Sequence, residues 1–168
     1  LTDVITEEQM KNVRELYDIA FPKEERKPFS LILQKRDEGV TEILAIEDET
    51  GTFYGLVITI LYKDIVLLDY FAIAEARRGG GVGSEILRLL QERCEGRRLL
   101  LEIEDTTRLP GIEETEVRVN CVRSDVSEQQ LSPEDRQKIR RKAFYLRNRM
   151  RPMNYRVELF GVDMEILT

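Results

Sequence analysis

Histidine and tryptophan are absent from this 168-residue chain, and cysteine occurs only twice. Without histidine the chain cannot form a Ser-His-Asp triad, a Cys-His pair or a two-histidine zinc site. Proton transfer near neutral pH must therefore use a carboxylate, tyrosine, lysine, cysteine, an amine or water. The spacing of Cys94 and Cys121 matches neither a zinc site nor a redox pair. We expect two reduced thiols, no metal, and a reducing compartment.

Long apolar runs are also missing. No stretch approaches the ~18 consecutive apolar residues of a membrane span, and no charged-then-apolar signal segment opens the sequence. Hydrophobic residues make up 42% and charged residues 35%, which excludes a disordered or collagen-like chain. A chain of this length can bury a sizeable core. We therefore expect one soluble, cytoplasmic domain over residues 1–168, with no membrane partner.

Charge is unevenly placed along the chain. The formal net charge is −6, but the segment Glu134–Arg151 holds eight basic residues and two acidic ones. A solvated helix face and an anion-contacting face both explain this segment. A nucleic-acid protein is usually basic overall, so the acidic remainder of the chain argues against a nucleic-acid partner.

The hydrophobic periodicity predicts two helices, then antiparallel strands, then a β-α-β unit. The capping box Thr6-Glu7-Glu8-Gln9 starts a helix that Pro22 ends, and a second helix is expected from Glu24 to Glu38. The cluster Asp48-Glu49-Thr50-Gly51 predicts a hairpin turn. Strands are expected at 42–47, 53–62, 65–73, 99–104, 155–160 and 162–167.

The second half of the chain is less regular. The strands at 65–73 and 99–104 flank one helix, so we expect them to be parallel with a right-handed crossover. Residues 105–131 are interpreted as a long excursion that includes a short strand at Glu116–Val119. Ser132 and Pro133 then start a helix, whose expected apolar face is Ile139, Ala143, Leu146 and Met150. The fold class is α/β (α+β), with a central mixed, mostly antiparallel sheet flanked by helices.

Four glycines fall within five residues where the strand 65–73 leads into a helix: Gly79, Gly80, Gly81 and Gly83. Backbone without Cβ atoms lets a group approach its amides closely, and a helix N-terminus favours an anion such as phosphate. A simple tight turn would need only one glycine. A nucleoside-triphosphate loop would require a lysine before Ser84, and none is present. A dinucleotide fingerprint is only partly matched and follows antiparallel strands, which argues against it.

The loop Arg78-Gly79-Gly80-Gly81-Val82-Gly83 has the form Arg/Gln-x-x-Gly-x-Gly/Ala and resembles that of the GNAT superfamily of N-acetyltransferases. The likeness covers most of the chain and is good at Leu68–Leu90. It is also good at Arg140–Met150, which is similar to the family's Phe-Tyr-x-x-x-Gly-Phe segment. Arg149 and Met150 stand there in place of glycine and phenylalanine. The resemblance implies an acyl-CoA acyltransferase fold in which the strands before the loop and after its helix splay apart.

The resemblance also implies site residues. Acetyl-CoA would be the cosubstrate, and Arg78 would shape the loop. Phe71 and Ile73 would offer backbone groups to the pantetheine arm and acetyl carbonyl, and Tyr145 would act as general acid near the thioester sulfur. The pyrophosphate would be held by the amides of Arg78, Gly79, Gly80, Gly81, Val82, Gly83 and Ser84.

Acetyl transfer suits a histidine-free chain, because direct attack by an amine needs no covalent intermediate and no metal. Glu102 and Glu104 share one face of a strand, and Glu104, nearer its end, is our candidate general base. Solvated strand-end acids are the alternative interpretation. Tyr145 shares a helix stripe with basic residues, which we expect to lower its pKa. That stripe consists of Lys138, Arg141, Lys142, Tyr145 and Arg149.

The sequence therefore predicts an N-acetyltransferase that moves an acetyl group from acetyl-CoA to a primary amine of a small molecule or peptide. A non-catalytic acyl-CoA-binding or sensing domain is the alternative, and a nucleic-acid binder is a weaker third hypothesis. Acidic residues hint at a cationic acceptor such as a polyamine, an amino sugar or a peptide amine. These acids are Glu102, Glu104, Glu113, Glu114 and Glu116. The superfamily often dimerises, which implies a possible homodimer.

Overall fold

The computed structural model describes residues 1–4, 6–106, 131–159 and 161–168. These residues form two compact units, Leu1–Leu100 and Leu101–Thr168. The expectation of one domain stays a prediction. Almost all of the expected excursion at 105–131, with its strand at Glu116–Val119, lies outside the described residues, as does Cys121.

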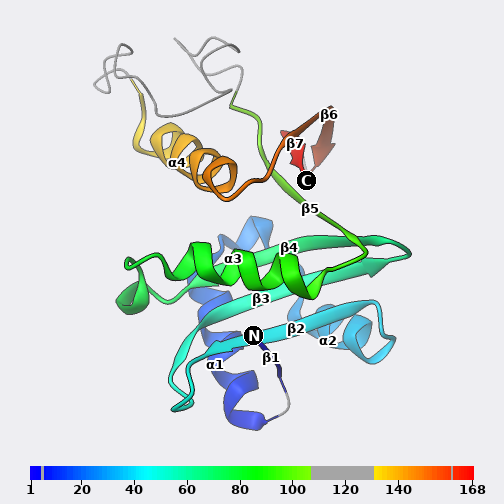
Figure 1. Ribbon diagram of the computed structural model, residues 1–168, viewed down its shortest axis with the longest axis vertical. Coiled ribbons are helices and arrows are strands. Elements are labelled where there is room, and N and C mark those ends of the chain that lie inside the picture. Colours follow the sequence, from blue (N-terminus) through cyan, green and yellow to red (C-terminus); the bar gives the residue numbers. More distant parts are fainter. Residues whose placement is uncertain (5, 107–130, 160) are drawn as a thin grey trace. The chain divides into compact units, whose positions relative to one another are not determined.

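The first unit is built on antiparallel strands, shown in Figure 1. In spatial order they are β1 (Thr2–Asp3), β2 (Thr41–Glu47), β3 (Phe53–Tyr62) and β4 (Ile65–Ile73). The predicted hairpin between β2 and β3 is confirmed. Its turn is held by the carboxylate of Asp48, which accepts hydrogen bonds from the amides of Thr50 and Thr52 at 2.9 and 3.0 Å.

Three α-helices accompany these strands: α1 (Glu7–Ala20), α2 (Phe29–Asp37) and α3 (Val82–Arg93). The predicted capping box at the start of α1 is confirmed, because Thr6 and Gln9 each accept the other's backbone amide. The prediction that the second helix begins at Glu24 is wrong. A short 3₁₀ helix, η1 (Lys23–Glu25), comes first, and α2 starts only after Pro28. Proline lacks an N–H and disfavours helical backbone at the residue before it.

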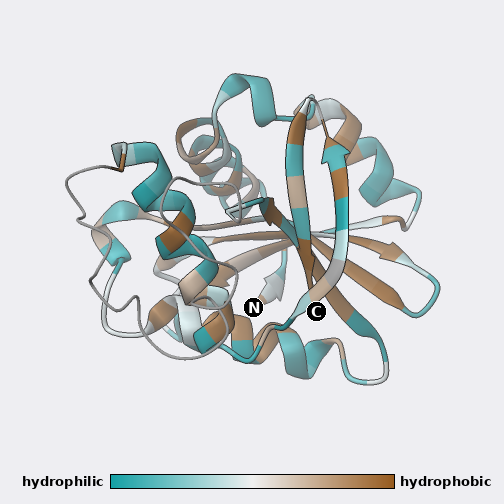
Figure 2. Cartoon of the chain, turned by 90° about the horizontal axis from the view of Figure 1, so that it is seen from above, coloured by the Kyte–Doolittle hydropathy of each residue, from teal (hydrophilic) through white to brown (hydrophobic). Residues whose placement is uncertain are grey.

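The two faces of this sheet are covered differently. One face forms a core with α1 and α2 that includes Val13, Tyr17, Ile32, Ile43, Leu56, Ile58 and Tyr70. Glu42 neighbours Ile43 and so points to the opposite face. There it pairs with Arg93 of α3 at 3.1 Å, which places α3 on that face. Hydrophobic colouring follows the strands, whereas the helices show both colours (Figure 2).

A β-bulge interrupts β4 at Asp69. Thr59 of β3 lies opposite Leu68, but its neighbour Ile58 lies opposite Tyr70, so Asp69 is the extra residue. The bulge turns Tyr70 toward α1 and α2, while Leu68 points to the other face. The strand thus includes the polar residue Asp69 while Leu68 and Tyr70 still point to opposite faces of the sheet.

The second unit contains the end of β5 (Arg98–Glu104), α4 (Pro133–Arg147), β6 (Pro152–Leu159) and β7 (Val162–Leu167). Strand β7 pairs antiparallel with both β5 and β6. The predicted cap of α4 is confirmed, since the Ser132 hydroxyl accepts the amide of Asp135 at 3.0 Å. The strand expected from Tyr155 begins earlier, at Pro152, and Phe160 lies outside the described residues.

The chain thus has the expected mixed α/β fold, with mostly antiparallel strands and flanking helices. The parallel pairing and splaying of β4 and β5 concern both units and stay predictions. Over the described ranges, no helix is long and apolar enough to cross a membrane.

Gly55 of β3 allows a close approach of two backbones. A Cβ at this position would lie 2.2 Å from the carbonyl oxygen of Ala72, so Gly55→Ala should lower the free energy of unfolding by about 3 kcal/mol. Gly51→Ala is the control, because it meets open space and only its φ of +82° is unfavourable, a cost of about 1 kcal/mol. Urea unfolding measures both. A loss at Gly55 no larger than at Gly51 would contradict the β3–β4 register.

Candidate functional site

The glycine loop after β4 adopts left-handed backbone at three successive residues. The φ angles of Gly79, Gly80 and Gly81 are +100°, +57° and +79°. A Cβ at any of them would meet nothing within 4 Å. Glycine is therefore required here for its backbone conformation, which costs other residues roughly 1–2 kcal/mol each, and the loop surface stays open.

Most amides of this loop are available to a ligand. The amide of Arg78 donates to the Glu75 carbonyl and that of Val82 to the Gly79 carbonyl, each at 3.2 Å. Five others find no acceptor among the described residues: those of Gly79, Gly80, Gly81, Gly83 and Ser84. They surround the N-terminus of α3, where Gly81 provides no side-chain cap. Unpaired amides and the positive end of the helix dipole together favour an anion.

Arg78 ties the loop back to the strand that precedes it. Its Nε donates a hydrogen bond to the carbonyl oxygen of Ile73 at 3.2 Å, which fits the predicted role of Arg78 in shaping the loop. Phe71 and Ile73 lie near the end of β4, opposite Val57 and Gly55. Because the Ile73 carbonyl already accepts this bond, a pantetheine arm would compete for it. The predicted contacts of Phe71 and Ile73 with that arm stay predictions.

The candidate base Glu104 is ion-paired within the second unit. Its carboxylate lies 2.6 Å from Nη1 of Arg141 and 3.9 Å from Nζ of Lys138, both on α4. The Glu104 side chain is only 20% exposed. The arrangement orients this carboxylate and engages one of its two oxygens with Arg141.

A buried ion pair also joins α4 to β7. Nζ of Lys142 lies 2.7 Å from a carboxylate oxygen of Glu165 and 3.2 Å from the hydroxyl of Thr106. Lys142 and Glu165 are 4% and 6% exposed. Together with the pairs on Glu104, this contact shows that much of the basic stripe is neither a solvated face nor an anion-binding face. It contacts carboxylates of the same unit.

The expected apolar face of α4 is confirmed only at Met150, which follows the helix and is 3% exposed. Ile139, Ala143 and Leu146 are only partly buried, whereas the buried positions within the helix are Lys142 and Tyr145. Periodicity alone could not reveal this, because pairing with Glu165 allows a lysine to occupy a buried position.

Tyr145 does not have the lowered pKa expected from its basic neighbours. Burial raises its pKa to about 12, with the charge of Arg141 opposing the shift only in part. The side chain is 9% exposed, and its ring packs edge-on against Phe144 at 5.2 Å. The expected lowering of the pKa is wrong because desolvation outweighs the nearby charge. A phenol that keeps its proton at neutral pH is the form that a general acid requires.

The turn after α4 forms despite the missing glycine. Arg149 adopts a φ of +69°, the left-handed conformation that glycine adopts without strain. The amide of Met150 donates to the Tyr145 carbonyl at 3.1 Å and closes the turn. The chain thus keeps the turn at the cost of a strained arginine.

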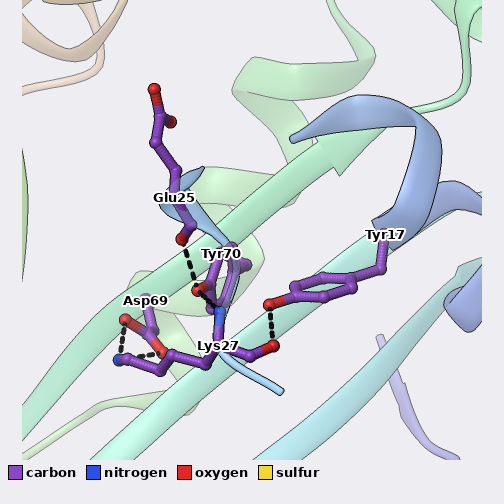
Figure 3. A network of polar contacts seen from close by, with 5 residues as sticks. All are labelled: Tyr17, Glu25, Lys27, Asp69 and Tyr70. Carbon is purple, nitrogen blue, oxygen red and sulfur yellow. Dashed lines mark hydrogen bonds and ion pairs between the residues drawn. The ribbon is translucent and has the colours of Figure 1, made fainter. Parts of the chain in front are cut away.

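A polar network links the start of α2 to β4 in the first unit, as Figure 3 shows. Nζ of Lys27 lies 2.7 Å from both carboxylate oxygens of Asp69. The Tyr70 hydroxyl accepts from the amide of Lys27 and donates to the carbonyl of Glu25, and the Tyr17 hydroxyl donates to the carbonyl of Lys27, each at 3.0 Å. Burial raises the pKa of Tyr17. Sequence analysis missed this network, although an aspartate in an apolar strand signals a buried partner.

Cys94 is 3% exposed, and burial raises the pKa of its thiol. Among the residues that the structure describes, no three acidic or cysteine side chains are grouped so as to hold a metal ion.

The mixed α/β fold carries a glycine loop at the N-terminus of α3, a position that favours an anion. Residues 10–112 match the acetyltransferase (GNAT) family. The chain therefore belongs to the acetyltransferase (GNAT) family. The match includes the glycine loop and ends before α4. No curated protein matches the chain.

Solved structures share the fold. A GNAT-family protein from Bacteroides thetaiotaomicron superposes with a TM-score of 0.66 at 21% identity, over 99% of this chain and 84% of that one. A spermidine N-acetyltransferase from Vibrio cholerae, in complex with CoA and spermine, gives 0.63 at 10% identity, over 97% and 90%. A dodecameric form of the Vibrio enzyme gives 0.62 at 11%, over 97% and 88%.

The raised pKa of Tyr145 has a measurable consequence. In an ultraviolet titration, the tyrosinate signal that Tyr145→Phe removes should appear near pH 12, above the ordinary value of 10.0. The pKa of Tyr145 is higher in the folded state than in the unfolded state. The contribution of the protonated side chain to the free energy of unfolding is therefore complete below pH 10 and is lost as the pH rises toward about 12. If the signal that Tyr145→Phe removes instead appears near or below pH 10, Tyr145 is exposed or its pKa is set by the neighbouring cations.

The Lys142–Glu165 pair can be tested by a double-mutant cycle. Lys142→Met leaves a buried carboxylate unpaired and should lower the free energy of unfolding by about 3 kcal/mol. Adding Glu165→Gln should recover much of this loss. Denaturant unfolding of the two single variants and the double variant measures the coupling. Additive losses would contradict a direct buried pair.

Proposed function

We propose that this chain is an acetyl-CoA-dependent N-acetyltransferase that acetylates a primary amine of a small molecule or peptide. The observation that carries the proposal is the set of five loop amides without an acceptor in the described chain, at the N-terminus of α3. They suit the pyrophosphate of the coenzyme. Membership of the acetyltransferase (GNAT) family supports this ligand.

The reaction proceeds by direct attack of the neutral amine on the thioester carbonyl. A new C–N bond forms, the C–S bond breaks, and the departing thiolate takes a proton. Tyr145, whose phenol keeps its proton at neutral pH, supplies that proton. Glu104 accepts the proton lost from the amine, through water, once its pair with Arg141 opens. Backbone groups of Phe71 and Ile73 position the acetyl-bearing arm.

A non-catalytic acyl-CoA-binding or sensing domain is the second candidate. The ion-paired state of Glu104 and the arginine at position 149 favour it, since both depart from an open catalytic site. This candidate predicts coenzyme binding with no acetylation of any amine in a broad panel.

The loop assignment is tested by adding a charge at Gly80. Aspartate and asparagine both tolerate left-handed backbone such as the φ of +57° found there. Gly80→Asp places a negative charge beside the amides and should weaken CoA binding more than about tenfold. Gly80→Asn, of the same shape but neutral, should weaken it far less. Isothermal titration measures both. Equal affinities would remove the loop from the coenzyme site.

The general-acid role is tested by Tyr145→Phe. Turnover should fall by roughly 10²-fold, because proton transfer to the thiolate is lost, while the affinity for CoA stays near that of the unaltered protein. Steady-state acetylation with thiol detection and a parallel binding titration provide the two readouts. Unchanged turnover would exclude Tyr145 as the acid, and lost CoA affinity would indicate a structural role instead.

A further inference from the structure

A solvent-open hollow of about 320 Å³ lies in the first unit where α1, η1 and the start of α2 meet. Its floor is aromatic. Tyr17 and Phe29 are 1% and 8% exposed, and their ring centroids lie 5.4 Å apart. None of the residues that line the hollow belongs to the glycine loop.

The charges that line this hollow are mostly positive: Arg14, Lys23, Arg26 and Lys27 face a single acid, Asp18. Arg26 pairs with Asp18, and Lys27 pairs with Asp69 of β4.

Arg14 and Lys23 form no ion pair with a carboxylate in the described part of the chain. Arg14 lies over the ring of Phe29, with its guanidinium carbon 5.4 Å from the ring centroid. A cation above an aromatic ring still has its N–H groups available at its edge. Two uncompensated cations therefore border the aromatic floor.

The wall of the hollow is fixed to β4 through Lys27. Its amide, carbonyl and ammonium groups are bound by Tyr70, Tyr17 and Asp69 respectively, as drawn in Figure 3. Strand β4 continues for three residues from Tyr70 to Ile73, a span of about 10 Å, and then leads into the glycine loop. One strand thus supports both the hollow and the proposed coenzyme loop.

We propose that this hollow binds the carboxylate of the acceptor, with Arg14 and Lys23 as its ligands and the acceptor's apolar portion against Tyr17 and Phe29. The substrate class is then an amine that also carries a carboxylate, such as an amino acid or a peptide end. This inference rests on the proposed acetyltransferase function. Of the cationic acceptors that the sequence suggested, it disfavours a polyamine, because like charges at the hollow repel one.

The first test measures binding without chemistry. The probe is 3-phenylpropanoate, which has an aromatic ring and a carboxylate but no amine; 3-phenylpropylamine is the matched cation. Ligand-observed NMR on the full chain should detect the carboxylate and not the amine. Lys23→Gln with Arg14→Gln should weaken carboxylate binding by roughly tenfold. The control Lys35→Gln with Arg36→Gln removes the same charge from α2, outside the lining, and should not.

The second test compares acceptors of equal length. For each ω-amino acid, the diamine of the same chain length replaces the carboxylate by an ammonium group. The kcat/KM for each amino acid should exceed the kcat/KM for the matching diamine. The Arg14 and Lys23 substitutions should reduce the ratio of these two values by roughly fivefold to tenfold. Lys23→Gln alone is included because the Lys23 side chain forms no hydrogen bond or ion pair within the described part of the chain.

The outcomes separate the two proposals. If the carboxylate binds and depends on Arg14 and Lys23 but no amine is acetylated, the acetyltransferase function fails and the anion site stands. If amines are acetylated but 3-phenylpropanoate does not bind, or the variants match the control, the inference about the hollow is overturned. A preference for diamines would overturn it as well.

Discussion

Three successive left-handed residues just before α3 are the constraint on which this structure's proposed chemistry depends. Only glycine adopts this backbone without strain, and Gly79, Gly80 and Gly81 all do so. The turn directs amides outward at the start of α3 instead of into an internal hydrogen-bond ladder. Arg78, bound to the Ile73 carbonyl, ties that turn to the strand. The strand itself is fixed to β3 by a register that needs glycine at position 55.

The second unit combines apolar burial, as at Leu101 and Leu167, with ion pairs between its helix and its strands. Its helix α4 meets β5 and β7 through Lys138, Arg141 and Lys142, which pair with two glutamates. This arrangement carries the adjacent Tyr145 into a buried position, and burial keeps its proton in place. The same pairs engage Glu104. The unit therefore holds a protonated phenol and an ion-paired carboxylate, each fixed by contacts of the same unit.

Local signals in the sequence predicted the features that are set locally. The capping box of α1, the serine cap of α4, the Asp48 turn and the glycine loop follow from the chemistry of a few neighbouring residues. Features that depend on distant partners were missed or misjudged. The bulge at Asp69 pairs with Lys27, and Lys142 is buried because Glu165 lies on β7. The predicted direction of the Tyr145 pKa shift was wrong for the same reason. The sequence shows a stripe of cations but not how deeply the tyrosine is buried.

The central claim is that the loop amides bind the diphosphate of the coenzyme. The most direct measurement is the amide NMR spectrum of the full chain during titration with CoA and, separately, with pantetheine, which lacks the diphosphate. The account predicts that the signals of the five loop amides shift with CoA and stay in place with pantetheine. Those amides are Gly79, Gly80, Gly81, Gly83 and Ser84. Unmoved loop signals at saturating CoA, with shifts elsewhere, would contradict it.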